Sequence, residues 1–265
     1  MNKLKTIFLP FISGILLLGI WYSVAFVYAK NEGYEVQRIV IPFPHQIVEA
    51  LWDERAILWI ATRQTAFAAL VGFIAAVTFG YVLSMLLASA VWVKRSLYPW
   101  ILVLQMTPVV VLAPIFVLWI GQGLPSITAI TFMIGFFPVV ANTTMGLIST
   151  DRNLIELFEM SNASKTQEIA YLRVPYAMPY FLTGMKIAGT LAPIGAIAGD
   201  LFAGSSQGGV GGIGFMVILY NSQVKVPELF ATAFVACFLG FIFVGCVNWP
   251  VSYTHLRAHE TLLYL

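Results

Sequence analysis

No charged residue lies between Arg95 and Asp151, and this feature excludes most folds. A stretch of that length without Asp, Glu, Lys or Arg is too long for one element of a soluble core, so it must cross a membrane. The composition agrees, because 60% of the 265 residues are hydrophobic and only 10% are charged, against roughly 25% charged in soluble domains. A net charge of +2 without any basic run gives no support to nucleic-acid binding.

A bilayer core of about 30 Å requires about 20 helical residues, and several apolar segments reach that length. They cover about 6–29, 64–91, 98–120, 127–149, 184–203 and 229–249. A membrane barrel would instead need alternating segments of about ten residues. We therefore expect an all-α, polytopic membrane protein with about six transmembrane helices. Pro108 and Pro114 should bend the third of them.

The chain divides into four predicted parts. They are a tail with the first transmembrane helix (1–30), an external segment (31–63), the membrane core (64–250) and a C-terminal tail (251–265). The first apolar segment is too long for a cleaved signal peptide. In the external part, Pro42 and Pro44 form a turn before an amphipathic helix over 46–58, which we expect on the outer membrane surface. The apolar side of that helix holds Ile47, Ala50, Leu51 and Trp52. The last part resembles a translated sequencing adapter rather than a native tail.

Lys and Arg residues near the segment ends predict the orientation. One side of the membrane receives Lys3, Lys5, Lys94, Arg95, Arg152, Lys165, Arg173 and Lys186. The other side receives Lys30, Arg38, Arg55, Arg63 and Lys225, mostly in a segment where acidic residues offset them. The bias places the N-terminus in the cytoplasm, and six crossings return the C-terminus to the same side.

A charged segment over 151–175 is too short to be a domain and must lie in water between two membrane segments. It predicts a short helix over about 153–160 that ends at Asn162, because Asn tolerates the left-handed conformation that stops a helix. Ser164 should cap a second helix with Gln167 as its capping-box partner. We expect Pro175 to stop that second helix at Val174. Two short helices at an angle would form a rigid lever in the cytoplasm.

This segment resembles the cytoplasmic coupling motif of ABC importer permeases. The family pattern is Glu-Ala-Ala, three residues, Gly, nine residues, Ile, one residue and Leu-Pro. Glu156 matches the Glu, Asn162 takes the Gly position, and Val174-Pro175 takes the Leu-Pro position, whereas Leu157-Phe158 replaces the Ala pair. The turn at Pro42, the run from Met106 to Gly121 and the run from Phe136 to Thr143 resemble permeases for nitrate, sulfonates, taurine, thiamine precursors or riboflavin.

The resemblance implies a type I ABC importer permease bundle in the cell (inner) membrane. Such a chain works as a homodimer in lipid, receives substrate from an external binding protein and carries no cofactor of its own, since ATP and Mg bind to a separate ATPase subunit. The residues that it assigns to ATPase coupling are Glu156, Leu157, Phe158, Glu159, Asn162, Ala163, Ser164, Val174 and Pro175. The transported substrate is not readable from the sequence.

Polar residues within the apolar segments are candidates for the translocation pathway or its gate. They and their neighbours are Gln105, Met106, Thr107, Pro108, Asn142, Thr143 and Asp200. Such groups usually face a bundle interior, although hydrogen bonds between helices would explain them equally well. We expect Asp200 near the outer end of the fifth segment, beside the glycine-rich turn that begins at Gly204. It would act at a gate or dimer contact, or it would be a solvated interfacial carboxylate.

The sequence lacks the residue sets that catalysis, metal binding or nucleotide binding would require. No Ser/His/Asp or Cys/His set predicts catalysis, and His255 with His259 is too small a set for a metal site. The glycines after Gly204 have neither the Lys-Ser/Thr of a phosphate loop nor the strand that precedes a dinucleotide fingerprint. An ion-driven secondary transporter or a channel remains the alternative, although a secondary transporter needs ion-coupling charges, and Asp200 is the one acid in the fifth segment.

Overall fold

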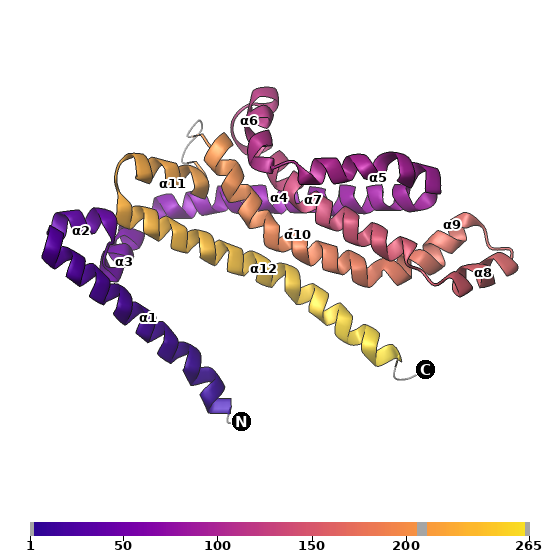
Figure 1. Ribbon diagram of the computed structural model, residues 1–265, viewed down its shortest axis with the longest axis horizontal. Coiled ribbons are helices and arrows are strands. Elements are labelled where there is room, and N and C mark those ends of the chain that lie inside the picture. The colour runs from indigo at the N-terminus through magenta and orange to yellow at the C-terminus, as the bar shows by residue number, and fades with distance from the viewer. Residues whose placement is uncertain (1–2, 206–210, 263–265) are drawn as a thin grey trace.

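The computed structural model describes the backbone of residues 3–205 and 211–262, and the described chain is helical with no strand (Figure 1). The elements in chain order are α1 (Lys3–Glu32), α2 (Tyr34–Val40), α3 (Pro44–Asp53), α4 (Arg55–Ser89), α5 (Val91–Met106), α6 (Val109–Ile120), α7 (Leu124–Ile148), α8 (Arg152–Met160), α9 (Lys165–Glu168), the π-helix η1 (Ile169–Arg173), α10 (Val174–Ala203), α11 (Ile213–Ser222) and α12 (Val226–Leu262). The side chains of 251–265, the predicted non-native tail, and residues 206–210 of the glycine-rich turn lie outside this description.

Five helices are long and apolar enough to cross a membrane, and a sixth crossing results if α5 and α6 form one bent span. The expectation of an all-α bundle with about six spans is therefore confirmed. The third predicted segment is broken rather than bent, because α5 and α6 meet at 105°. Thr107 has an extended backbone and Pro108 caps α6, as expected for a residue that precedes proline. Pro114 lies inside α6 without ending it.

The expectation that Pro175 stops a helix at Val174 is wrong. The helical path continues from α9 through η1 into α10, which begins at Val174 and is the fifth span. Pro175 is the second residue of α10, directly after η1, so it lies inside the helical path without ending it. The fifth span thus starts ten residues before the predicted Gly184, and α9 is joined to it through a continuous helical path.

The centre of the fold is α7, which packs between α4 and α10 through small residues. A Cβ on Gly184 of α10 would lie 2.9 Å from the carbonyl oxygen of Pro138 in α7. A Cβ on Gly199 would lie 3.1 Å from the Cα of Ile127, in the first turn of α7. The two backbones are therefore in close contact along most of their length, and we call this contact the α7–α10 seam. Small residues allow such approach between membrane helices, whose association depends on van der Waals packing.

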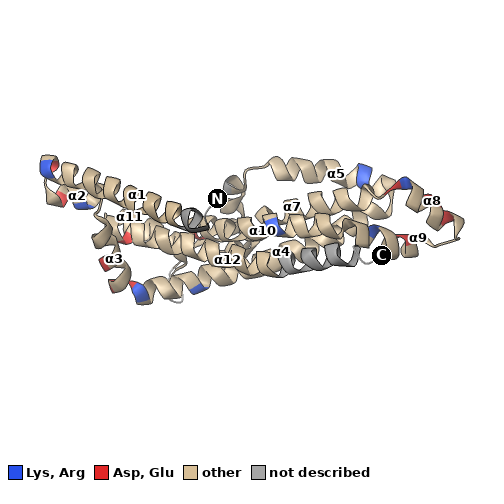
Figure 2. Cartoon of the chain, turned by 90° about the horizontal axis from the view of Figure 1, so that it is seen from below, with Lys and Arg blue, Asp and Glu red and all other residues tan. Residues whose placement is uncertain are grey.

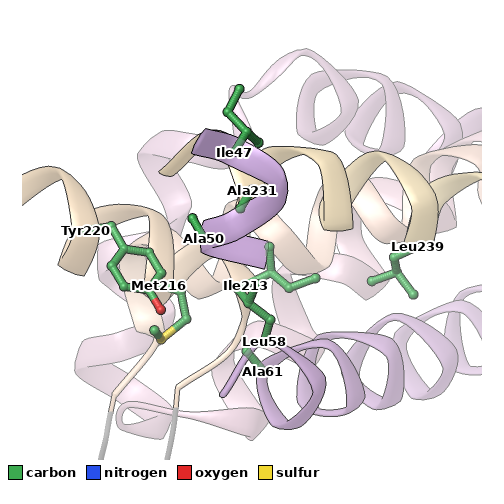
Figure 3. Packing of buried hydrophobic residues seen from close by; sticks show 9 residues of the cluster. All are labelled: Ile47, Ala50, Leu58, Ala61, Ile213, Met216, Tyr220, Ala231 and Leu239. Carbon is green, nitrogen blue, oxygen red and sulfur yellow. The ribbon is translucent and has the colours of Figure 1, made fainter. Parts of the chain in front are cut away.

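A second core lies where α3, α4, α11 and α12 converge (Figure 3). Ile47 and Ala50 of α3 are buried in it, next to Ile213 and Met216 of α11. The amphipathic helix predicted over 46–58 is thus not one surface helix, because it ends at Asp53 and α4 begins at Arg55. Of its predicted apolar side, Ile47 and Ala50 pack on protein, whereas Trp52 is exposed.

Charged residues gather at the two ends of the elongated molecule, with a mostly uncharged length between them (Figure 2). One end holds α2 and α3, and the opposite end holds α8 and α9. Helix α1 stands apart from the bundle over most of its length and contacts the other helices chiefly near α2 and α3 (Figure 1). This arrangement leaves α8 and α9 as the part that extends beyond the spans at its end of the molecule.

Candidate functional site

The segment 151–173 leaves the bundle between α7 and α10, and we call it the projection. Local signals in its sequence fix its shape. Asp151 caps α8 by accepting a hydrogen bond of 2.9 Å from the backbone N–H of Asn153. Asn162 has a φ of 54°, which is the left-handed conformation predicted for it. Ser164 and Gln167 form the predicted capping box at the start of α9. The first predicted helix, the start of the second and the corner between them are confirmed.

Helix α8 carries exposed apolar side chains, since none of its residues is buried. Leu154, Leu157 and Met160 follow one another at a spacing of three residues and are 41%, 56% and 83% exposed, so they lie close together on the helix surface. Phe158 is half-buried and Glu156 is exposed. A charged helix with exposed large apolar side chains has the character of a contact surface for another protein.

The predicted coupling residues fall into two groups. The corner residues Asn162 and Ser164 are exposed, and Ala163 between them is half-buried. Val174 and Pro175 lie instead at the start of α10. The corner, α9 and η1 separate them from α8 along the chain. The structure therefore separates the residues of α8 and the corner, which belong to the projection, from the two that begin the span.

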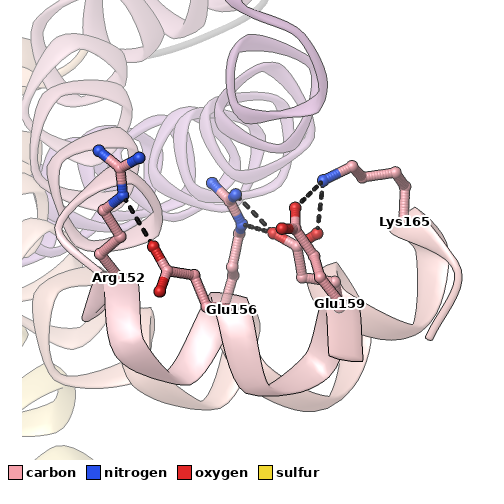
Figure 4. A network of polar contacts seen from close by, with 6 residues as sticks. Arg152, Glu156, Glu159 and Lys165 are labelled. Atoms are coloured by element: carbon pink, nitrogen blue, oxygen red, sulfur yellow. Dashed lines mark hydrogen bonds and ion pairs between the residues drawn. The ribbon is translucent and has the colours of Figure 1, made fainter. Parts of the chain in front are cut away.

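Ion pairs connect the parts of the projection (Figure 4). Arg152 and Glu156 pair along α8 at 3.2 Å. Lys165 of α9 lies 3.4 Å from Glu159 of α8 and 2.9 Å from Glu168. Glu168 is the exception among these acids, because its side chain is only 3% exposed.

Glu168 also accepts a hydrogen bond of 2.7 Å from Nε of Arg173, the last residue of η1. Sequence reasoning missed Glu168. Its signal is an acid with a Lys three residues before it and an Arg five residues after it. Side chains five residues apart do not face each other in a regular α-helix, so the sequence gives no reason to pair Glu168 with Arg173.

Asp200 is buried at the far end of α10, with 1% of its surface exposed. Its carboxylate accepts a hydrogen bond of 2.5 Å from the hydroxyl of Thr65 in α4. The same Thr65 oxygen accepts one of 2.8 Å from the N–H of Ile213, the first residue of α11. Asp200 thus joins three helices and lies against Gly212, so its predicted place beside the glycine-rich turn is confirmed. The alternative of a solvated carboxylate is wrong, because the described helices around it exclude solvent.

An open cavity of about 760 Å³ lies beside Asp200. Its described lining comes from α4, the start of α7 and the end of α10. The polar members are Arg63, Gln64, Asp200 and Ser205, and Phe67 and Leu70 are among the apolar ones. A cavity with few polar groups in apolar walls is typical of small-molecule sites.

The structure does not bring all of the pathway candidates together. Asn142 lies against Gly184, whose Cβ would be 3.2 Å from the Asn142 Cβ. The sixteen residues from Gly184 to Asp200 span about 24 Å of helix, so Asn142 and Asp200 lie at different depths along the α7–α10 seam. The Asn142 amide donates to the carbonyl of Pro138 at 2.8 Å, and Thr143 is fully buried.

The candidates at the α5–α6 break form a separate group. Gln105, Met106 and Pro108 are exposed, and Thr107 is half-buried and donates a hydrogen bond to the carbonyl of Val103. Gln105 therefore does not face the interior of this chain's own bundle. Among the described residues, no three His, Cys, Asp or Glu side chains form a group that could hold a metal ion.

Comparisons with known proteins agree with this architecture. The family model described as the binding-protein-dependent transport system inner membrane component matches residues 68–256. The formylaminopyrimidine transport permease protein ThiX of Halalkalibacterium halodurans is 35% identical over 234 residues, which are 88% of this chain and 89% of that protein. The riboflavin transport system permease protein RibX of Chloroflexus aurantiacus is 30% identical and is matched over 72% of this chain and 70% of its own length.

A solved structure shares the fold. It is described as the crystal structure of an amino acid ABC transporter with histidines, and it superposes with a TM-score of 0.61 over 78% of this chain and 96% of that chain. The sequences are only 13% identical, so this likeness concerns the arrangement of helices alone.

Proposed function

This chain belongs to the family of binding-protein-dependent transport system inner membrane components, and from this premise we propose that two copies of it form the translocation pathway of an ATP-driven importer. A separate ATPase subunit docks on the projection of each copy, and ATP and Mg bind there. An external binding protein delivers the substrate to the opposite side. ATP binding moves the projections and opens the pathway outward, and hydrolysis resets it.

The projection is the observation that carries this proposal. It places the exposed apolar residues of α8 beyond the spans, on a segment that continues directly into α10. A partner that binds α8 therefore applies force close to the start of a membrane helix. Figure 4 shows that an ion pair connects α8 to α9, so a force on α8 is transmitted to α9 and from there toward α10.

The orientation follows from the same segment. The ATPase needs cytoplasmic ATP, so the projection and the N-terminus both lie in the cytoplasm, in agreement with the distribution of Lys and Arg. The opposite end, with α2, α3 and the cavity beside Asp200, then faces outward. We propose that the chain lies in the cell membrane. Residues 64–250 would then form its permease core.

The cavity beside Asp200 and the α5–α6 break are proposed as parts of the pathway or of its gate. The relatives named above carry a formylaminopyrimidine and riboflavin in their names. Both compounds are nitrogen heterocycles, and we extend this class to the present chain as the first to screen with its binding protein.

Docking is tested by Leu157→Ala with Phe158→Ala, and separately by Glu156→Lys. Loss of two apolar contacts at an interface should weaken co-purification of the ATPase by about tenfold or more. Leu118→Ala is the matched control, because Leu118 is 82% exposed on α6, far from the projection in sequence. Equal co-purification in all of these variants would refute docking on α8.

The alternative of an ion-driven secondary transporter makes a different prediction. Membrane vesicles that contain this chain without its ATPase should take up no substrate under an imposed ion gradient. Uptake under that gradient alone would favour the secondary transporter and overturn the importer proposal.

A further inference from the structure

The connection between the projection and α10 is a π-helix. In η1 the backbone hydrogen bonds join residues five apart, as between the N–H of Val174 and the carbonyl of Ile169. Single π-helical turns within α-helices are rare and are frequent at functional sites. Here the turn lies where the projection ends and the membrane span begins, so it fixes how the two parts are oriented. We call residues 168–174 the joint.

The side chains of the joint depend on this backbone. Glu168 and Arg173 are five residues apart and form a hydrogen bond of 2.7 Å. In a regular α-helix with 3.6 residues per turn, positions five apart point about 140° away from each other. The wider π turn brings the two side chains onto one side. The ion pair therefore depends on the π-helical backbone, and it should in turn stabilise that backbone.

The Glu168–Arg173 pair is more buried than the other ion pairs of the projection, so we expect it to contribute more to stability. The Glu168 side chain is 3% exposed and that of Arg173 is 20% exposed, whereas Arg152 and Glu156 are 90% and 57% exposed. Exposed pairs contribute little, but loss of one partner from a buried pair leaves an uncompensated charge. The second cation on Glu168 is Lys165, whose ammonium also reaches Glu159 of α8. One carboxylate thus connects α8, through Lys165, with the start of α10, through Arg173.

The network around Glu168 is the most buried part of the projection. No residue of α8 or η1 is buried, and Glu168 is the buried residue of α9. An apolar core, which would fix the angle of a longer segment, is therefore missing from the described residues of the projection. Ile155, Phe158, Ile169 and Leu172 are half-buried, so the ion network around Glu168 is the fully buried contact that helps to set this angle.

We propose that Glu168 is a positioning residue that locks the π-helical joint, so that the projection and α10 move as one rigid body. The proposal deepens the function proposed above and rests on it where ATP-driven transport is concerned. The ATPase binds to α8, but its motion reaches α10 only while the joint is locked. Loosening the joint should therefore separate docking from transport.

The first experiment needs no partner. Nitroxide spin labels are placed on Met160→Cys in α8 and Ile187→Cys in α10, with Cys237 and Cys246 replaced by alanine, and pulsed electron resonance measures the distance between them in the full chain. The distance distribution should be narrow with Glu168 present and broad in Glu168→Gln. Thr166→Ala is the matched control, because Thr166 is exposed on the same helix, and its distribution should stay narrow. An equally narrow distribution in Glu168→Gln would overturn the lock.

The second experiment measures coupling in proteoliposomes with the ATPase and binding protein. Glu168→Gln should leave ATPase co-purification unchanged while substrate uptake per ATP hydrolysed falls by about tenfold, a usual size for coupling between sites. The double variant Glu168→Gln with Arg173→Gln should be no worse than the single variant, because the two residues act as one pair. Arg173→Lys, which keeps the charge, should retain more coupling than Arg173→Gln.

The outcomes separate the two proposals. If the wild-type chain does not co-purify with the ATPase, the proposed function fails, and the spin-label distances still decide whether the joint is locked. If docking occurs and Glu168→Gln keeps full uptake per ATP, the proposed function stands and the positioning role of Glu168 is wrong. Multiplied losses in the double variant would also contradict it, because they would mean that the two residues act independently.

Discussion

The α7–α10 seam and the projection are neighbours in sequence, yet they are held together by opposite means. Along the seam, glycines bring two backbones into contact, as Gly184 does with Pro138 and Gly199 with Ile127. In the projection, a helical cap at Asp151, a left-handed residue at Asn162 and a set of ion pairs take that role. The first region has no ion pair among its described residues, and the second has no apolar core among its own.

The difference is explained by two solvents, the bilayer around the seam and, as we propose, water around the projection. Between membrane helices there is no hydrophobic driving force, so close packing supplies the stability. In water, an isolated helix shorter than about 12 residues is marginal, and α8 has nine. Caps and ion pairs are then needed to hold its shape. A seam built by packing is difficult to adjust, whereas a projection built from polar contacts can respond to a partner.

The largest effect should come from filling the seam. Gly184→Leu places a side chain against the carbonyl oxygen of Pro138 and the Cα of Val139, and backbone atoms cannot move aside as a side chain can. Overpacking costs about 1–3 kcal/mol or more, so the melting temperature of the purified chain in detergent should fall sharply, with little folded protein recovered.

The matched control for that change is Gly240→Leu. A Cβ on Gly240 of α12 would meet no heavy atom within 4 Å, and this substitution should leave the melting temperature unchanged. A normal melting curve for Gly184→Leu would mean that the seam is not the rigid element of the fold.

The next effect concerns Asp200, the one buried acid at the end of the seam. Among the described residues no ion pair involves it, and an acid within a membrane span costs roughly 2.5–3.5 kcal/mol on insertion scales. Asp200→Asn should therefore leave assembly and melting temperature unchanged or raised, whereas substrate uptake in proteoliposomes slows by about tenfold, that is about 1.4 kcal/mol. Uptake at the wild-type rate in Asp200→Asn would show that Asp200 has no role at the gate.

A smaller effect is expected at the corner of the projection. Asn162 has a φ of 54°, and Asn162→Ala should destabilise α8 by about 1 kcal/mol, because alanine resists the left-handed conformation. Hydrogen exchange of the α8 amides measures this loss. Asn162→Gly is the control and should be neutral or protective, since glycine adopts a positive φ freely. Equal exchange in all three proteins would show that the corner is not set by residue 162.

The smallest effect should follow Arg152→Gln. Arg152 and Glu156 pair along an exposed face of α8 at 3.2 Å, and such pairs contribute about 0.3–0.5 kcal/mol. Hydrogen exchange of the same amides should change barely, and ATPase co-purification should remain. A change in hydrogen exchange as large as that expected for Asn162→Ala would contradict the small contribution assigned to this exposed pair.

The sequence predicts the parts of both regions that depend on local or compositional signals. The spans follow from length and hydropathy, and the corner follows from Asn162 and from the pair Ser164 and Gln167. Which proline interrupts a helix does not follow. Pro108 breaks one, whereas Pro114 and Pro175 lie within helices, and only the surrounding packing decides between these outcomes.

Contacts between distant residues are also beyond local patterns. Thr65 and Asp200 are 135 residues apart, and nothing in either segment indicates the other. Glu168 is paired with Arg173 only because the backbone between them is π-helical, and the spacing of five residues predicts no contact in an α-helix. The candidate site was therefore predictable as a segment but not as a mechanical connection.

The central claim is that the projection lies in the cytoplasm, where an ATPase can reach it. The most direct measurement places Met160→Cys in a chain without Cys237 and Cys246 and labels it with a maleimide that does not cross membranes. We expect labelling in inverted membrane vesicles and none in intact cells. Labelling of Met160→Cys in intact cells would put the projection on the outer side and contradict the account.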